Sequence, residues 1–331
     1  MRRPLLVLAL AGLLVVAGCV GDPAATGTDD TVPDDAPPDG ELAIHHIDVG
    51  QADATLLRAP NGETMLIDSG DWRDDGQGVL SYLDEQGIDR IDHLVATHAH
   101  ADHIGGHAAV IDAYETERDG IGAVYDSGLA HTSQTYANYL DAVEAHDVDL
   151  FEVREGDSIP FGDAVEVTVL NPPEDPGTDL HAGSVVLSVE FGETRYLTTG
   201  DAEREVEQRL LDRWDEALDA DLYHAGHHGS STSSSAAFLD AVDPSTALVS
   251  SALDSQYGHP HDEILERFGD RGLDVYWTAV HGDVVFRSDG EGFTATAGAD
   301  GPTDPLDLIE LKHGGETQRV PVDSRQLPTV Q

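Results

Sequence analysis

Residues 97–106 read Thr-His-Ala-His-Ala-Asp-His-Ile-Gly-Gly. Three histidines and one aspartate fall within six positions, directly after the mostly apolar run 91–97. Imidazole and carboxylate groups suit a zinc-type divalent cation, and a loop at the end of a strand can turn several side chains toward one point. A solvated histidine-rich loop is the alternative, but such loops rarely lie between a buried strand and a Gly-Gly helix start. The segment therefore predicts a metal site at a strand end.

Short apolar runs and helical patterns continue on both sides of this segment. Strands are predicted at 42–48, 54–58, 64–68, 91–97, 123–125, 150–153, 165–170, 185–191, 195–199, 221–223, 247–250, 275–278 and 284–287. Helices are predicted at 79–86, 106–114, 134–145, 203–214, 235–241 and 263–268. Strand groups alternate with helices without one βαβ rhythm, which indicates packed sheets with helices outside them.

The first 19 residues have the pattern of an export signal. Two arginines precede an apolar run from 5 to 17 that is short for a membrane span, and residues 16–19, Val-Ala-Gly-Cys, resemble a lipoprotein cleavage box. We expect Cys19 to become the lipidated first residue, which would anchor the chain at the extracellular face of the cytoplasmic membrane. An uncleaved anchor helix is the alternative, and the arginine pair is compatible with twin-Arg export.

The rest of the chain is predicted to hold one folded domain. Residues 20–40 are rich in Asp, Pro, Thr and Gly, cannot bury enough surface to offset their ordering entropy, and are expected to form a disordered acidic linker. The domain is placed at 41–290, and the polar segment 291–331 is left without an assigned structure. One cysteine in the whole chain excludes a disulfide framework and every cysteine-rich zinc module.

The chain is strongly acidic, with 64 Asp and Glu against 17 Lys and Arg, a formal charge of −47, and Lys312 is its single lysine. Such a charge excludes a broad basic surface for nucleic acid in ordinary salt. The composition is typical of proteins from salt-loving organisms, because molar salt shortens the Debye length to ~3 Å and screens repulsion among carboxylates. Disorder from excess charge is the alternative, and the many apolar runs argue against it.

Further motifs follow in a fixed order along the chain. Residues 66–70 read Leu-Ile-Asp-Ser-Gly, 199–201 read Thr-Gly-Asp, and 227–230 read His-His-Gly-Ser. Together with 97–106 they resemble the metallo-β-lactamase superfamily over roughly 41–290. Asp-Val-Gly-Gln-Ala-Asp at 48–53 and Tyr-Gly-His-Pro at 257–260 resemble, more narrowly, the hydrolase domain of ComEC-type competence proteins. The resemblance implies an α/β fold, an αββα four-layer sandwich, with the site at one edge of the two sheets.

The same resemblance implies a site for two metal ions. The implied ligands are His98, His100, Asp102, His103, Asp201 and one of His227 and His228. The first two histidines would hold one metal, and Asp102 and His103 the other, together with His227 in preference to His228 because the motif begins there. Asp201 would bridge both ions, since a carboxylate has two oxygens, and Asp68 would fix the orientation of a ligand.

One ligand position and the metal itself stay open. Residues 179–184 read Asp-Leu-His-Ala-Gly-Ser, where ComEC-like sequences often have an Asn/Ser-rich stretch. His181 is therefore either a further ligand of the first metal or a polar residue near the substrate. The cofactor is expected to be two divalent ions, Zn²⁺ or Mn²⁺, because histidine and aspartate ligands do not separate the two.

The expected chemistry is hydrolysis. Two cations about 3.5–4 Å apart can share a water and lower its pKa from about 15.7 toward neutrality, so that hydroxide attacks phosphorus or a carbonyl carbon. The candidate catalytic residues are Asp102, Asp201 and His259, and the candidate substrate-binding residues are Gly229, Ser230 and His259. His259 would contact the substrate or protonate the leaving group, or else be a turn histidine before Pro260.

Three functions compete. The leading hypothesis is a surface-tethered phosphodiesterase or nuclease acting on extracellular DNA, nucleotides or another phosphodiester. An ester, lactone or β-lactam hydrolase would use the same hydroxide, and a non-catalytic surface lipoprotein is the third reading. No protein partner is indicated. Trp72, Trp214 and Trp277 are expected to be packing residues, since a base-stacking platform would need a basic groove beside it.

Overall fold

The structure is a computed structural model in which residues 38–317 are described. Cys19, the predicted export signal and nearly all of the predicted linker lie outside the described residues. None of the described helices combines the length and the apolar composition that crossing a membrane requires.

The first sheet has eight strands in the order β14-β13-β1-β2-β3-β4-β5-β6. They are β1 (Leu42–His46), β2 (Thr55–Arg58), β3 (Thr64–Ile67), β4 (Ile91–Val95), β5 (Ile121–Asp126), β6 (Leu150–Glu152), β13 (Val284–Ser288) and β14 (Phe293–Ala297). Pairing is antiparallel from β14 to β3 and parallel from β3 to β6.

The second sheet has six strands in the order β12-β11-β10-β9-β8-β7. They are β7 (Glu166–Asn171), β8 (Val186–Phe191), β9 (Thr194–Thr198), β10 (Leu222–His224), β11 (Thr246–Val249) and β12 (Asp274–Trp277). Strands β9 to β12 are parallel, and β7 to β9 are antiparallel.

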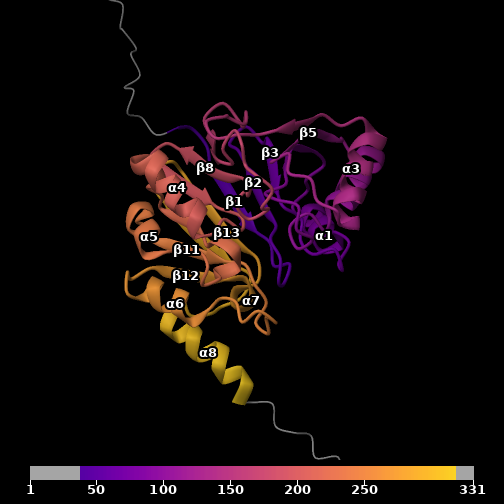
Figure 1. Ribbon diagram of the computed structural model, residues 1–331. Helices are drawn as coiled ribbons and strands as arrows, with labels where there is room; N and C mark the ends of the chain where they lie inside the picture. Colours follow the sequence, from indigo (N-terminus) through magenta and orange to yellow (C-terminus); the bar gives the residue numbers. More distant parts are fainter. Residues whose placement is uncertain (1–37, 318–331) are drawn as a thin grey trace, which may run out of the picture. The chain divides into compact units, whose positions relative to one another are not determined.

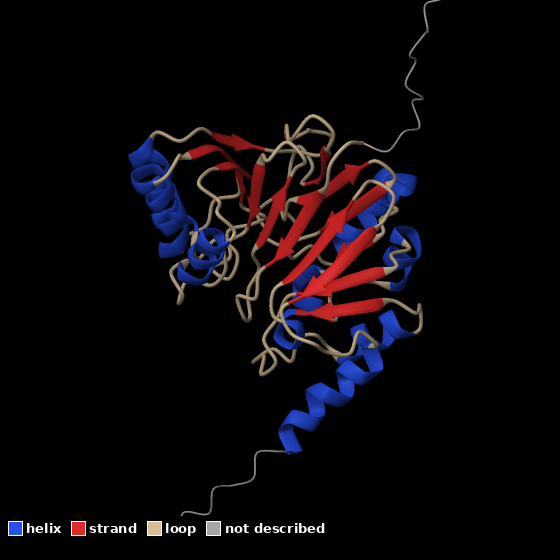
Figure 2. Cartoon of the chain, turned by 180° about the vertical axis from the view of Figure 1, so that it is seen from behind, coloured by secondary structure: helices blue, strands red, loops and turns tan. Residues whose placement is uncertain are grey.

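The two sheets pack face to face, with helices on both outer faces (Figures 1 and 2). The helices are α1 (Gln77–Glu85), α2 (His107–Glu117), α3 (Gln134–His146), α4 (Arg204–Trp214), α5 (Ala236–Val242), α6 (Asp262–Gly269), α7 (Thr278–His281) and α8 (Pro305–Thr317), with short 3₁₀ turns η1 (Asp215–Leu218) and η2 (Gly226–Gly229). Helices α1 to α3 cover the first sheet, and α4 to α6 cover the second.

Alternation along the strands builds these layers. In β8, Leu187 and Val189 face the core between the sheets, whereas Val186 faces the helices on the other side. Successive side chains of a strand point to opposite faces, so a strand buried on both sides is apolar throughout. The predicted αββα sandwich is confirmed, and every predicted strand and helix is present with ends that differ by a few residues.

The domain boundary placed at residue 290 is too early. Strand β14 pairs with β13 from Val284–Ala297 to Ser288–Phe293, and α8 packs on α6 and buries Leu308. Strand β14 lies at the sheet edge with its middle exposed, and α8 is largely solvated. Both segments therefore lack the apolar pattern by which the other elements were recognised.

Candidate metal centre

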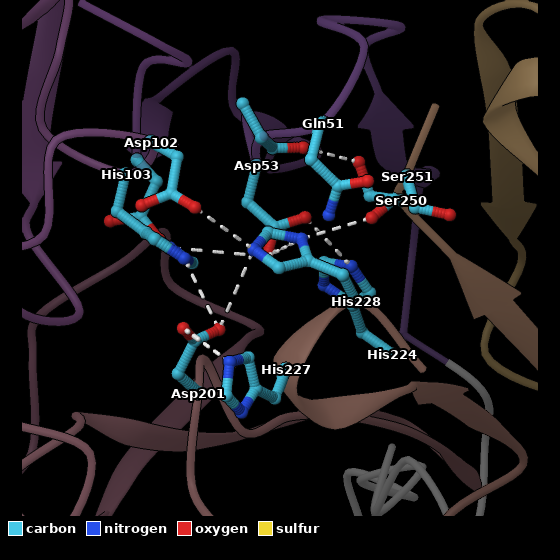
Figure 3. A network of polar contacts seen from close by, with 12 residues as sticks. Gln51, Asp53, Asp102, His103, Asp201, His224, His227, His228, Ser250 and Ser251 are labelled. Carbon is cyan, nitrogen blue, oxygen red and sulfur yellow. Dashed lines mark hydrogen bonds and ion pairs between the residues drawn. The ribbon is translucent and has the colours of Figure 1, made fainter. Parts of the chain in front are cut away.

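Loops that follow five strands meet at one edge of the sandwich. The carboxyl ends of β1, β3 and β4 lead to Asp53, Asp68 and the 97–103 loop, and those of β9 and β10 lead to Asp201 and η2. These strands run in the same direction within their sheets, and carboxyl ends that meet at a sheet edge are the usual place for a site in α/β folds. Residues far apart in sequence are thereby brought together (Figure 3).

Asp201 lies at the centre of this group and is 2% exposed. Its Oδ2 lies 3.4 Å from His98 Nε2, and its Oδ1 lies 3.2 Å from His103 Nε2. The two carboxylate oxygens thus face two different groups of ligand atoms, as the predicted bridging role requires.

On the Oδ2 side lie His98, His100 and His181. Together with Asp201 they offer four ligand atoms that all lie within 4.8 Å of one another. His98 Nε2 is 2.8 Å from His100 Nδ1, and His181 Nε2 is 3.9 Å from Asp201 Oδ2. The structure therefore brings His181 to this group, in the place that a further ligand of the first metal would occupy.

On the Oδ1 side lie Asp53, His103 and His228, all buried, which with Asp201 form a second set of four ligand atoms. Asp53 was quoted in the 48–53 motif but given no role. Its backbone N–H donates to the Asp102 carbonyl at 3.1 Å, so the motif is tied directly to the 97–106 loop. The sequence signal that could have identified Asp53 as a ligand candidate was its place as a single acidic residue just before the apolar run 54–58.

The sequence favoured His227 over His228 as the ligand that joins His103, and the structure places His228 there instead. His228 Nε2 lies 3.5 Å from Asp102 Oδ2 and 3.8 Å from Asp201 Oδ1, whereas His227 joins His181 and Glu203 in a third, more exposed group. Both histidines have positive φ, 51° and 56°, and this turn sends their rings to different sides of Asp201 (Figure 3). Sequence spacing cannot separate two neighbours whose backbone is left-handed.

Asp68 holds the His103 ring in place. Its Oδ1 accepts the Thr97 backbone N–H at 2.8 Å, and its Oδ2 accepts the Thr97 hydroxyl at 2.6 Å and His103 Nδ1–H at 2.7 Å. His103 Nε2 is thereby left facing Asp201. A carboxylate that fixes the tautomer of a ligating histidine has this arrangement, and the orienting role of Asp68 stays a prediction.

The donor set fits divalent cations. His103 Nε2, His228 Nε2 and Asp201 Oδ1 are buried and have no hydrogen-bond partner among the described residues. Unpaired buried polar atoms are rare and costly in proteins, and here all three lie on the Oδ1 side of Asp201. A divalent cation on that side would satisfy them, and His98, His100 and His181 offer ligand atoms on the Oδ2 side.

The histidine pKa values also differ between the two sides of Asp201. Burial opposes protonation of His103, but the Asp201 and Asp68 carboxylates outweigh it and raise its pKa well above the usual range. Burial likewise opposes protonation of His228, yet Asp53 and Asp201 raise its pKa to about 9. On the other side, burial and the neighbouring His98 and His181 lower the pKa of His100 to about 4. Protons therefore stand in for a cation on the Oδ1 side.

A cavity of about 490 Å³ opens over both groups. It is lined by His100, Ala101, Asp102, His181, Asp201, His227, His228, Tyr257 and His259. Burial and the neighbouring His228 and His227 lower the pKa of His259 to about 3, so this histidine is neutral at pH 7. The lowered pKa argues against proton donation by His259, and its place in the cavity lining leaves contact with the substrate as the expected role.

The lining drawn from residues 38–317 includes neither Gly229 nor Ser230. Gly229 has φ of 77°, and a Cβ there would lie 2.7 Å from Pro260 Cβ, so this glycine permits close packing of two loops. The Ser230 hydroxyl bonds to the Thr232 hydroxyl at 3.0 Å. Both residues thus shape η2, and their role in binding substrate stays a prediction.

Comparisons with known proteins agree with this geometry. The family model described as metallo-beta-lactamase superfamily matches residues 47–252. ComE operon protein 3 of Bacillus subtilis (strain 168) is 29% identical over 263 residues, which cover 75% of this chain and 33% of that protein. Competence protein ComA of Neisseria gonorrhoeae is 30% identical over 252 residues, which cover 76% and 33%. The chain spans about a third of the length of these relatives.

Among solved structures, CmlA, a diiron beta-hydroxylase from Streptomyces venezuelae, superposes with a TM-score of 0.50 at 17% identity. The match covers 76% of this chain and 55% of CmlA. At this identity the likeness concerns the fold alone.

Proposed function

The chain belongs to the metallo-beta-lactamase superfamily of metal-dependent hydrolases, and from this premise we propose that it cleaves phosphodiester bonds with a pair of divalent cations. Similarity to proteins named for competence supports DNA or nucleotides as the substrate class. The likeness to ComEC-type proteins that the 48–53 and 257–260 motifs indicated is confirmed by these relatives.

The observation that carries the proposal is the two-sided environment of Asp201. Its two oxygens face two separate sets of ligand atoms, at 3.4 Å from His98 and 3.2 Å from His103. Divalent cations held there would act as Lewis acids, lowering the pKa of a shared water and stabilising negative charge on the substrate oxygens. Either Zn²⁺ or Mn²⁺ suits these ligands.

Residues of the chain orient one metal ligand and line the cavity that would hold the substrate. Asp68 fixes the His103 ring through a 2.7 Å hydrogen bond, so the ligand does not have to be reoriented during the reaction. Asp102 and neutral His259 line the cavity, where the N–H of His259 can donate one hydrogen bond to a phosphate oxygen. No serine or cysteine nucleophile is needed in this scheme.

Location at the cell surface is part of the proposal. The pattern of residues 1–19 supports export and lipidation at Cys19, and an acidic linker would place the domain outside the membrane. There the enzyme would meet extracellular DNA or nucleotides. Mass spectrometry of the mature protein tests the lipidation directly.

The activity is tested with purified protein in molar salt, supplied with Zn²⁺ or Mn²⁺. We expect turnover of bis-p-nitrophenyl phosphate or linear DNA but not of a β-lactam. Asp201→Asn should lower kcat by more than about 100-fold, since residues that merely orient ligands already contribute about 10- to 100-fold. Glu205→Gln, on the exposed first turn of α4, is the matched control and should retain activity.

Two results would contradict the proposal. Turnover of the β-lactam without any phosphodiester cleavage would assign carbonyl chemistry to the same centre. Fewer than one bound divalent ion per chain after dialysis would favour a non-catalytic surface lipoprotein.

A further inference from the structure

A second cavity of about 430 Å³ adjoins the metal cavity and shares Ala101, Asp102 and Tyr257 with it. Its remaining lining residues are Val49, Gln51, Asp71, Trp72, Arg73, Asp74 and Gln256. The second space therefore lies directly beside the metal cavity.

Two exposed aromatic side chains stand at this cavity. The expectation that Trp72 is a packing residue is wrong: it is 52% exposed, and Tyr257 is 57% exposed. Trp277, by contrast, is fully buried, and Trp214 packs against the core beside the second sheet. Large aromatic rings left in solvent beside a cavity are a common feature of binding sites.

The backbone holds Trp72 rigidly against the metal loop. Its N–H donates to the Ala101 carbonyl at 3.0 Å, and Gly105 N–H donates to the Gly70 carbonyl at 2.9 Å. A Cβ at Gly105 would lie 2.1 Å from Trp72 N, so only glycine permits this close approach. Gly105, in the second half of the 97–106 motif, thus lets the backbone of Trp72 lie against the metal loop.

The charges of the lining decide what the cavity accepts. Asp71 and Asp74 are carboxylates, and the Arg73 guanidinium is already paired with Asp71 at 2.8 Å and stacked 5.0 Å from the Trp72 ring centre. A second phosphate group would meet repulsion without a free cation. An uncharged planar ring would meet two aromatic faces and the amides of Gln51 and Gln256, which can both donate and accept hydrogen bonds.

We propose that this cavity binds the nucleobase next to the phosphate held at the metal centre, an inference that rests on the proposed phosphodiesterase function. The basic groove that a stacking platform ordinarily needs is not required here, because the cations themselves attract the phosphate. The cavity thereby makes the substrate a nucleotide or nucleic acid rather than any phosphodiester.

Calorimetric titration of the metal-loaded full chain tests this with deoxyadenosine 5′-phosphate and with 2-deoxyribose 5-phosphate, which carries a hydroxyl at C1 in place of the base. The nucleotide should bind about 5- to 150-fold more tightly, the range expected for stacking of one base. Trp72→Ala should lose most of this difference while binding the sugar phosphate as before, and Tyr257→Ala, whose ring also lines the metal cavity, should reduce the difference as well. Trp72→Phe keeps a stacking ring and should retain the preference.

Equal binding of the two ligands by the wild type would overturn the proposal, as would a Trp72→Ala variant that weakens both ligands alike. A wild type that prefers the nucleotide but cleaves no phosphodiester would support the base-binding cavity and refute the proposed function. Melting curves check that each variant is folded.

Discussion

At the scale of single residues, Asp53 shows most clearly what the sequence could and could not predict. Its Oδ1 lies 3.3 Å from His224 Nε2, and its Oδ2 lies 3.7 Å from His228 Nδ1. Burial would raise the pKa of Asp53, but His224 and His228 hold it well below the usual range. The motifs identified most ligand candidates because residues of one short loop stay close together in the folded protein. The place of Asp53 in the site, and the side of Asp201 toward which His228 points, depend on contacts between distant loops.

The pKa of His228 leads to a pH prediction. Asp53 and Asp201 raise it to about 9, so the cation-free protein carries this proton at pH 7. A histidine must be neutral to bind a metal, so cation binding has to expel the proton. The apparent metal affinity should therefore rise between pH 7 and pH 9, by up to about tenfold per pH unit for each proton expelled, and His103, whose pKa is also raised, adds a second proton to that of His228. Above pH 9 the contribution of His228 should level off.

Chelator competition at several pH values measures this, together with proton release in weak buffer. His228→Ala should release fewer protons per cation bound than the wild type. An affinity that stays flat from pH 7 to pH 9 would show that His228 does not meet the metal.

At the scale of elements, helix α8 ties down the loop that carries His259. Lys312 Nζ donates to the Gly258 carbonyl at 3.0 Å, the Pro260 carbonyl at 2.7 Å and Asp262 Oδ1 at 2.8 Å. These bonds use all three donors of an ammonium group. The strands and the helices that cover the sheets were predictable because their apolar residues recur with the period of a strand or of a helix. This helix was not, since its attachment depends on Lys312 and on few buried apolar side chains, such as Leu308.

Lys312→Met should loosen this loop. Two carbonyls and a carboxylate lose their partner, which typically costs about 1–3 kcal/mol for a buried group. We expect a lower melting temperature, faster protease cleavage near residues 253–259 and a higher KM. Glu310→Met, at an exposed position of the same helix, is the matched control and should change none of these. Unaltered cleavage of the loop in Lys312→Met would show that α8 does not restrain it.

At the scale of the whole molecule, the formal charge of −47 sets the conditions in which the fold is stable. Repulsion among surface carboxylates destabilises the compact state, and added salt screens it as the Debye length shortens from ~10 Å at 0.1 M to ~3 Å at 1 M. Only the composition supports this expectation that salt stabilises the fold. The sheet architecture does not depend on the surface charge, because the cores between and outside the sheets are apolar.

The melting temperature should therefore rise by several degrees between 0.1 M and 2 M KCl. Calorimetry over this range measures the effect, and the same series in sucrose controls for changes unrelated to screening. A melting temperature that falls with KCl would contradict the salt-adapted interpretation of the composition.

The attachment of α8 can also be followed by chemical labelling of the native protein. Lys312 is the one lysine in the entire sequence, and its side chain is 14% exposed. An acylating reagent specific for primary amines would therefore have a single internal target besides the chain terminus. Slow modification would mark the docked helix and rapid modification the released one, so a labelling time course reads the state of the His259 loop without any engineered probe.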